Sequence, residues 1–157
     1  MARFRYSMQS ILNIKMKMET QAKQEFSAAA AALEEEEKRL QALHRRKRGY
    51  EEKAKALLSG ALNVRDIEEN RTAILCMKDY IEQQKAKVKI AEDNLEKARA
   101  KLTEVRMERK THEILKEKAF EEFLMEEKRR ESKEIDELTS YTYGQRRFAE
   151  KAESIPV

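Results

Sequence analysis

The stretch LLSGALNVRDIEEN, residues 57–70, decides how the rest of the chain is arranged. It holds a glycine among turn-forming residues, between two long segments with helical periodicity. Ser59 and Gly60 favour the end of a helix, because glycine adopts the left-handed conformation that closes a helix C-terminus. Asn63 followed by Asp66 resembles a helix N-cap with an acidic residue in the first turn. We therefore predict that the chain reverses at residues 59–63. The alternative is one continuous helix that contains Gly60 and is destabilised by it by about 1 kcal/mol relative to alanine.

The composition favours long helices over a compact globule. Of 157 residues, 41% are charged and 6% are aromatic, with three glycines and one proline. The apolar residues are mainly Ala, Leu, Ile and Met among Glu and Lys, which is typical of helices with a narrow apolar stripe. No apolar run approaches the roughly 20 residues that a membrane-spanning helix needs. The first twenty residues lack the apolar segment of a secretory signal.

Before the turn, apolar residues recur at steps of three and four, which is the spacing of a coiled-coil seam. Lys15, Glu36 and Lys47 are its polar members. Two consecutive steps of four around Ala22 predict one stutter, where the supercoil locally unwinds. The expected seam consists of Met8, Ile11, Lys15, Met18, Ala22, Phe26, Ala29, Leu33, Glu36, Leu40, Leu43, Lys47, Tyr50, Ala54 and Leu57.

A second seam follows the turn and alternates strictly between steps of three and four. After Val105 the same frame meets Arg109, His112 and Lys116, and apolar residues reappear out of phase. We expect this seam to change or lose its partner there. Its expected members are Ile67, Asn70, Ile74, Met77, Ile81, Gln84, Val88, Ala91, Leu95, Ala98, Leu102 and Val105.

These patterns predict an all-α fold: a long antiparallel two-helix coiled coil, which is a stalk-like helical hairpin over residues 1–157. We expect the first arm at about residues 5–58, the turn at 59–63, the second arm at about 64–140 and a frayed tail at 141–157. With a reversal near residue 61 or 62, paired residue numbers sum to about 123. This register places Leu57 near Asp66 and Met8 near Leu115.

The sequence offers no constellation of catalytic or metal-binding residues. His112 and Glu113 begin like the helix motif of zinc proteases, but Lys116 stands where the second His is required. The three glycines are far apart, and none opens a phosphate-binding loop. A two-helix coiled coil also lacks the interior in which substrate pockets form. We therefore predict no enzyme activity, no metal and no cofactor.

The charge pattern gives no dedicated surface for polyanions. The net charge is only +4, from 34 basic and 30 acidic residues intermixed along the chain. The basic run 44–48 has the charge to attract phosphate groups of nucleic acid or lipid, but Glu34–Glu37 and Glu51 flank it. We favour a solvated helix face and expect no nucleic-acid partner.

Two clusters of aromatic and apolar residues point to protein partners, because exposed apolar patches on a coiled coil commonly contact other proteins. One cluster lies near the turn and contains Tyr50, Met77 and Tyr80. The other, at the opposite end of the expected hairpin, contains Phe4, Tyr6, Phe120, Phe123 and Leu124. We expect a connector between two partners.

Three segments have distinctive sequences: FRYSMQSILNIKMKMETQAKQEF at residues 4–26, DYIEQQKAKV at 79–88 and ERKTHEILKEKAFEEFLMEEKRRESKEIDELTSYTYG at 108–144. Together they resemble the flagellar export protein FliJ family of the bacterial type III export apparatus. The resemblance spans about residues 2–144. The resemblance implies an antiparallel coiled coil similar to the stalk of rotary ATPases. It also implies that the protein functions in flagellum assembly, and so in motility and chemotaxis.

The resemblance also implies the partners. Members of the family insert the end bearing both termini into the hexameric ring of the export ATPase FliI. The part near the turn contacts the cytoplasmic domain of the export gate protein FlhA, and export chaperones are further partners. We therefore expect a cytoplasmic protein, peripheral at the cytoplasmic side of the cell membrane at the flagellar base, with membrane contact only through partners.

By local pattern, the resemblance assigns contact residues to both ends. Arg46 stands where the family often has an aromatic residue in the first arm. The expected ATPase-ring contacts are Met8, Ile11, Lys15, Arg109, His112 and Lys116. The expected export-gate contacts are Leu43, Tyr50, Met77, Tyr80 and Gln84.

Two other functions compete with the flagellar export stalk. One is the equivalent stalk of a related virulence type III secretion system. The other is a basic coiled-coil module that binds nucleic acid or anionic membrane, and this function requires binding that fades steeply as salt rises.

Overall fold

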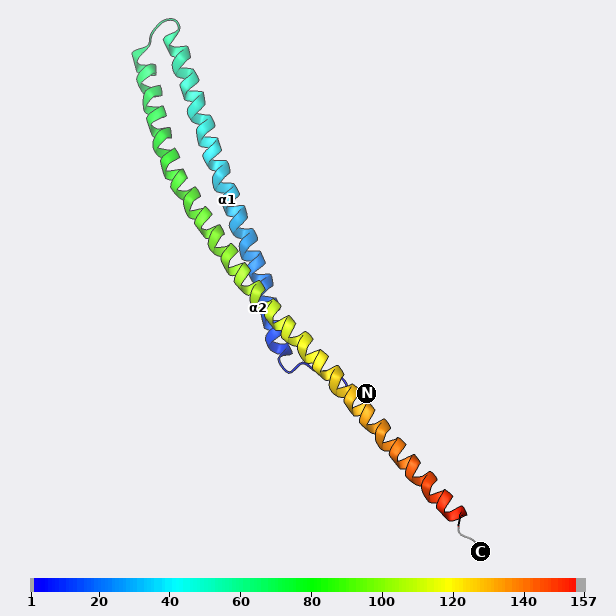
Figure 1. The fold of residues 1–157 in the computed structure, drawn as a ribbon. Helices are drawn as coiled ribbons and strands as arrows, with labels where there is room; N and C mark the ends of the chain where they lie inside the picture. The colour runs from blue at the N-terminus through cyan, green and yellow to red at the C-terminus, as the bar shows by residue number, and fades with distance from the viewer. Residues whose placement is uncertain (1, 155–157) are drawn as a thin grey trace. The chain divides into compact units, whose positions relative to one another are not determined.

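The computed structural model describes residues 2–154, and in this part of the chain it contains two α-helices and no strand (Figure 1). Helix α1 spans Gln9–Leu58 and helix α2 spans Val64–Glu153. The predicted fold class, an all-α antiparallel helical hairpin, is confirmed. The chain divides into two compact units, Lys15–Glu108 and Met1–Ile14 with Arg109–Val157.

The turn between the helices forms through the residues that the sequence indicated. Gly60 has a φ of 123°, a backbone conformation that glycine adopts far more readily than any other residue. The Ser59 amide and hydroxyl both donate to the carbonyl of Ala56, at 3.2 and 3.0 Å. On the other side, the Asn63 side-chain oxygen accepts the Arg65 amide at 3.1 Å. Asn63 is therefore the N-cap of α2, and the predicted reversal is confirmed.

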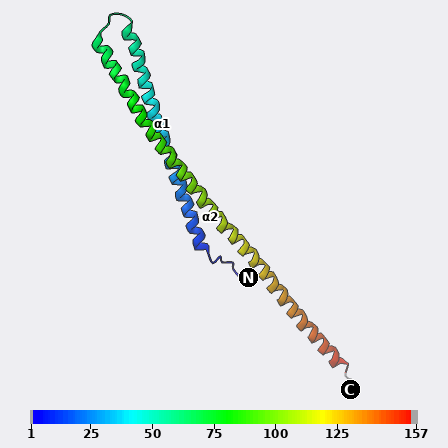
Figure 2. The ribbon, with the colours of Figure 1, turned by 60° about the vertical axis from the view of Figure 1, so that its left-hand side comes forward.

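Within Lys15–Glu108, α1 and α2 lie side by side and antiparallel, as Figures 1 and 2 show. Polar contacts between the helices mark the register along this unit. The predicted register, with residue numbers that sum to about 123, is confirmed. The contacting pairs are Lys15 with Glu108, Glu25 with Lys101, Glu36 with Gln84 and Tyr50 with Asn70.

The core of this unit is a narrow seam between the helices. Every predicted member of the second seam, from Ile67 to Val105, is buried or half-buried. So is every predicted member of the first seam from Ala22 to Leu57. The most completely buried apolar residues in the unit are Ala22, Met77, Ile81, Ala91, Leu102 and Val105.

The predicted stutter in the first seam is wrong. Met18 is 39% exposed, whereas the neighbouring Glu19 is only 7% exposed and occupies the seam. The carboxylate is tolerated there because Arg106 approaches it from the other helix at 3.4 Å and Lys23 approaches at 3.5 Å. With Glu19 in place of Met18, the seam alternates between steps of three and four without interruption.

The unit of Met1–Ile14 with Arg109–Val157 begins with a non-helical segment. Helix α1 begins at Gln9 rather than at about residue 5, and the Gln9 amide donates to the carbonyl of Tyr6 at 3.1 Å. Leu12 is the buried residue of this part of α1, whereas Met8 and Ile11, which the sequence placed in the seam, are exposed. The reason is that the seam frame continues from Glu19 through Lys15 to Leu12.

In the same unit, the α2 frame does not change after Val105. Arg109, His112 and Lys116 are half-buried, and the frame continues to Phe123. Apolar residues do not mark this part of the frame, because long polar side chains occupy its positions. Their apolar stems are able to line a seam while the charged groups reach solvent.

Helix α2 also ends later than expected, at Glu153 rather than at about residue 140. No proline interrupts it, and contacts one turn apart support its last part. The Gln145 amide donates to the Tyr141 hydroxyl at 2.8 Å, and the Arg147 guanidinium lies 5.9 Å from the centre of the Tyr143 ring. From residue 128 to 153 every side chain is exposed.

Candidate functional site

The described residues contain no group of three or more His, Cys, Asp or Glu side chains placed to hold a metal ion. Neither helix has, within the described residues, a stretch long and apolar enough to cross a membrane. The candidate functional features described below are surfaces of the two helices. They fall into a region near the turn, in the unit Lys15–Glu108, and a region in the other unit.

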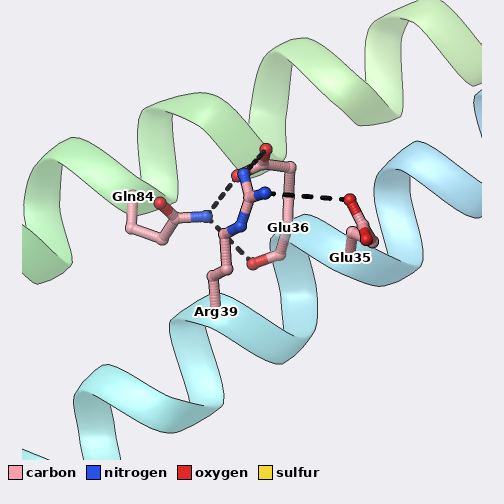
Figure 3. A network of polar contacts seen from close by, with 4 residues as sticks. All are labelled: Glu35, Glu36, Arg39 and Gln84. Carbon is pink, nitrogen blue, oxygen red and sulfur yellow. Dashed lines mark hydrogen bonds and ion pairs between the residues drawn. The ribbon is translucent and has the colours of Figure 1, made fainter.

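A polar layer crosses the seam near the middle of α1 (Figure 3). The Gln84 amide nitrogen donates to the main-chain oxygen of Glu36 at 3.0 Å and to its carboxylate at 2.5 Å. Arg39 holds the other carboxylate oxygen at 2.8 Å and reaches Glu35 at 3.7 Å. A buried amide that loses its partner is costly, so this layer disfavours helix pairings that are out of register.

A second polar layer lies nearer the turn. The Asn70 side-chain nitrogen donates to the main-chain oxygen of Tyr50 at 3.0 Å. Its side-chain oxygen is buried and has no hydrogen-bond partner. Asn70 therefore links the helices and leaves one unused acceptor beside the surface near the turn.

The five expected export-gate residues all belong to the unit Lys15–Glu108, but only Tyr80 lies on its surface, with 50% of the residue exposed. Leu43 and Tyr50 are half-buried. Met77 and Gln84 are each 6% exposed and lie in the seam. Of the expected set, Tyr80 is the residue most accessible to another protein.

The sequence reasoning missed an apolar groove near the turn, which we call the turn groove. Leu58 is 66% exposed and Leu75 is 56% exposed. Each directly follows a seam residue, Leu57 or Ile74, so paired apolar residues were the signal in the sequence. The turn groove has a volume of about 360 Å³ and is lined by Ala54, Leu57, Leu58, Ile67, Asn70, Arg71, Ile74, Leu75 and Lys78.

The basic run of α1 forms a second hollow, of about 520 Å³. His44, Arg45 and Arg48 line it, and Lys47 is paired with Glu51 at 3.6 Å. All of the lining residues belong to α1, and the hollow lacks apolar side chains that could anchor a ligand. The solvated helix face remains our interpretation of this run.

The expected ATPase-ring residues lie in both units. Met8, Ile11, Arg109, His112 and Lys116 belong to the unit with the N-terminal segment, whereas Lys15 belongs to the other unit, where it contacts Glu108 at 2.8 Å. Arg109 forms an ion pair with Glu113 at 2.7 Å. The Nδ1 atom of His112 is buried without a hydrogen-bond partner.

The N-terminal segment is attached to α2 by aromatic contacts. The Phe4 ring centre lies 5.1 Å from that of Phe120, in an edge-to-face arrangement, and 5.4 Å from that of Phe123. Aromatic pairs with these geometries stabilise beyond the area they bury. The cluster expected from the sequence therefore includes a direct contact between the N-terminal segment and α2.

The last part of α2 carries a second surface that the sequence reasoning missed. Its exposed large apolar residues are Ile135, Leu138, Tyr141, Tyr143 and Phe148. Ile135, Leu138 and Tyr141 lie at steps of three residues, so they share one side of the helix. We call these three residues the tail stripe. Ile135 and Leu138 belong to the second arm that the sequence predicts, so this helical spacing was the signal in the sequence.

Comparisons with known proteins agree with this architecture. The family described as flagellar FliJ protein matches residues 4–148. A solved structure of a YscO homolog from Chlamydia trachomatis is similar over 92% of this chain and 98% of that chain, with 21% sequence identity and a TM-score of 0.60. At this identity the structural likeness concerns the fold alone. No curated protein matches the chain.

Proposed function

The chain belongs to the family of flagellar FliJ proteins, and we propose that it is the non-enzymatic stalk that links the export ATPase ring to the export gate. The family places the chain in a type III protein export apparatus. The observation that best supports a stalk is the uninterrupted seam between α1 and α2, which has apolar surface residues beside the turn. A stiff hairpin is suited to transmit a position from one partner to another.

Stiffness of the hairpin follows from the polar layers as well as from the seam. In the observed register, the side-chain nitrogens of Gln84 and Asn70 donate to the main-chain oxygens of Glu36 and Tyr50. A shift of one helix along the other separates these groups and leaves buried polar atoms without partners. The stalk is thus resistant to sliding, which a coupling element between two machines requires.

The proposed gate contact lies beside the turn. Tyr80 is the exposed anchor, and Leu43 and Tyr50 are half-buried members of the first seam. Met77 and Gln84 hold the helices together beneath this surface, so they contribute to gate binding through the shape of the hairpin. The partner at this surface is the cytoplasmic domain of FlhA.

The proposed ATPase contact lies in the unit that contains the N-terminal segment. Met8 and Ile11 offer exposed apolar side chains. Arg109, His112 and Lys116 contribute half-buried polar groups. Lys15, the remaining residue that the family resemblance implies, belongs to the other unit. The partner is the hexameric ring of FliI, which places the protein at the cytoplasmic side of the membrane at the flagellar base. Export chaperones are further partners of the same protein.

A binding assay with the two partners tests the proposal. The purified chain is mixed with FliI and, separately, with the cytoplasmic domain of FlhA at moderate salt. We expect both proteins to be retained by the chain. If neither protein is retained while DNA or anionic vesicles bind in a strongly salt-dependent manner, the chain is instead a polyanion-binding coiled coil.

The likeness in fold to a YscO homolog favours a second candidate, the stalk of a virulence type III secretion system. Complementation distinguishes the two stalks. We expect expression of this chain to restore swimming in a flagellated bacterium that lacks its own stalk gene. Restoration of virulence secretion without restoration of swimming contradicts the flagellar assignment and supports the second candidate.

A further inference from the structure

The turn groove is an apolar surface with a basic rim. Arg71 lies one helical turn before Leu75, and Lys78 lies one turn after Ile74. Both cations are exposed, and within residues 2–154 neither has an ion-pair partner. Many other charged residues of the chain are paired one turn apart, as Lys38 is with Glu34. The groove therefore combines exposed apolar side chains with two unused positive charges.

The base of the turn groove contains an unused hydrogen-bond acceptor. The Asn70 side-chain oxygen is buried, has no partner and belongs to a residue that lines the groove. Buried polar atoms in folded proteins are nearly always hydrogen-bonded. The hairpin itself therefore leaves this acceptor of the groove residue Asn70 without a donor.

The tail stripe has the opposite charge pattern. Glu131 lies one turn before Ile135, Glu134 one turn before Leu138 and Glu137 one turn before Tyr141. These carboxylates are exposed, and none of the three forms an ion pair within the described residues. The stripe is thus an apolar row bordered by unused negative charges.

The two surfaces complement each other, and we propose that the turn groove of one copy of this chain binds the tail stripe of a second copy. Ile135 and Leu138 fill the apolar floor between the helices, and the carboxylates face Arg71 and Lys78. The Tyr141 hydroxyl is a donor of suitable size for the free oxygen of Asn70. The role of the protein in export is not a premise of this proposal.

The dimensions of the two surfaces also agree. The α2 wall of the turn groove runs from Ile67 to Lys78, and the stripe with its carboxylates runs from Glu131 to Tyr141. At 1.5 Å per residue both segments are on the order of 15 Å long. The tail then packs as a third helix beside the hairpin, which is a common mode of recognition for an amphipathic helix.

Sedimentation velocity of the full chain over a wide range of concentrations tests the proposal. We expect reversible association that strengthens with concentration and weakens with salt. The groove variant, Arg71→Glu with Lys78→Glu, carries negative charge on both surfaces and is expected to associate about tenfold more weakly. The tail variant, Glu131→Lys with Glu134→Lys, carries positive charge on both surfaces and is expected to lose association to a similar extent.

Mixing the two variants gives the sharpest result. The unchanged acidic tail of the groove variant then meets the unchanged basic groove of the tail variant, so we expect the mixture to associate about tenfold more tightly than either variant alone. A control variant, Arg45→Glu with Arg48→Glu, makes the same change in net charge on exposed arginines elsewhere. We expect it to associate like the wild type. Circular dichroism verifies that all variants remain helical.

Three results overturn the proposal. The first is a wild-type chain that stays monomeric at every concentration. The second is association that the groove and tail variants leave unchanged, and the third is a mixture of variants that stays monomeric. Binding to FliI or FlhA is measured separately, so failure of this proposal and failure of the export role are distinguishable.

Discussion

The Gln84 side-chain amide donates to the main-chain oxygen of Glu36 at 3.0 Å, and this contact joins the two helices inside their seam. Gln84 occupies a position where an apolar residue is the rule in coiled coils. The amide is buried and its main contacts are with one residue of the opposite helix, so its effect depends on the observed register.

We expect Gln84→Ala to lower the free energy of unfolding by about 1–2 kcal/mol, because the oxygen of Glu36 loses its buried donor. Thermal and denaturant unfolding followed by circular dichroism measure the change. Gln83→Ala is the matched control, because the Gln83 bond to Asp79 lies on an exposed helix face. Equal effects of the two substitutions contradict a role of Gln84 in the seam.

The exchange of Met18 for Glu19 in the seam leads to a second prediction. Met18→Lys is expected to change the free energy of unfolding by less than about 0.5 kcal/mol, since Met18 is on the surface. Glu19→Leu is expected to leave stability unchanged or raise it, because apolar residues often replace buried ion pairs without loss. Denaturant unfolding of both variants measures these changes. A large loss of unfolding free energy in Met18→Lys contradicts a seam in which Glu19 replaces Met18.

The glycines provide a matched pair of substitutions. Gly60→Ala is expected to cost about 1–3 kcal/mol, because an alanine at a φ of 123° is strained. Gly49→Ala is expected to stabilise by about 0.5–1 kcal/mol, since Gly49 is inside α1 and a methyl group there meets nothing within 4 Å. Thermal unfolding measures the two changes in stability, which are expected to have opposite signs. A stabilising Gly60→Ala contradicts the turn.

Tyr80→Ala is expected to weaken binding to the cytoplasmic domain of FlhA by about tenfold, because exposed tyrosines are frequent anchors of interfaces. The helical content stays unchanged, since the side chain is half-exposed and outside the seam. Calorimetry measures the affinity. Tyr143→Ala, an exposed tyrosine of the other unit, serves as the control. Equal affinity of wild type and Tyr80→Ala removes Tyr80 from the proposed gate contact.

Phe4→Ala is expected to release the N-terminal segment from α2, because the ring contacts with Phe120 and Phe123 are lost. Hydrogen exchange reports the change as faster exchange at the start of α1, where the Gln9 amide donates to the Tyr6 carbonyl. Arg5→Ala, at an exposed neighbour, is expected to leave exchange unchanged. Unaltered exchange in Phe4→Ala contradicts attachment through this ring.

The candidate site was only partly predictable. The sequence located the region near the turn, because Tyr50, Met77 and Tyr80 are concentrated there. It did not distinguish Tyr80, which is exposed, from Met77 and Gln84, which are buried. Residues three and four positions apart share a helix face, and only the packing of the partner helix decides which of them it covers. The tail stripe did not follow from the seam periodicity, because Ile135, Leu138 and Tyr141 lie beyond the last residue of the predicted second seam.

The sequence by itself determined the two helices, the turn and the antiparallel register. These features follow from local signals, such as the stop at Ser59 and Gly60, the cap at Asn63 and the repeat of three and four residues. Only the tertiary structure decided that Glu19 replaces Met18 in the seam and that the frame continues past Val105. A charged side chain enters a seam when a partner such as Arg106, distant in sequence, approaches it. The periodicity of one helix contains no information about that partner.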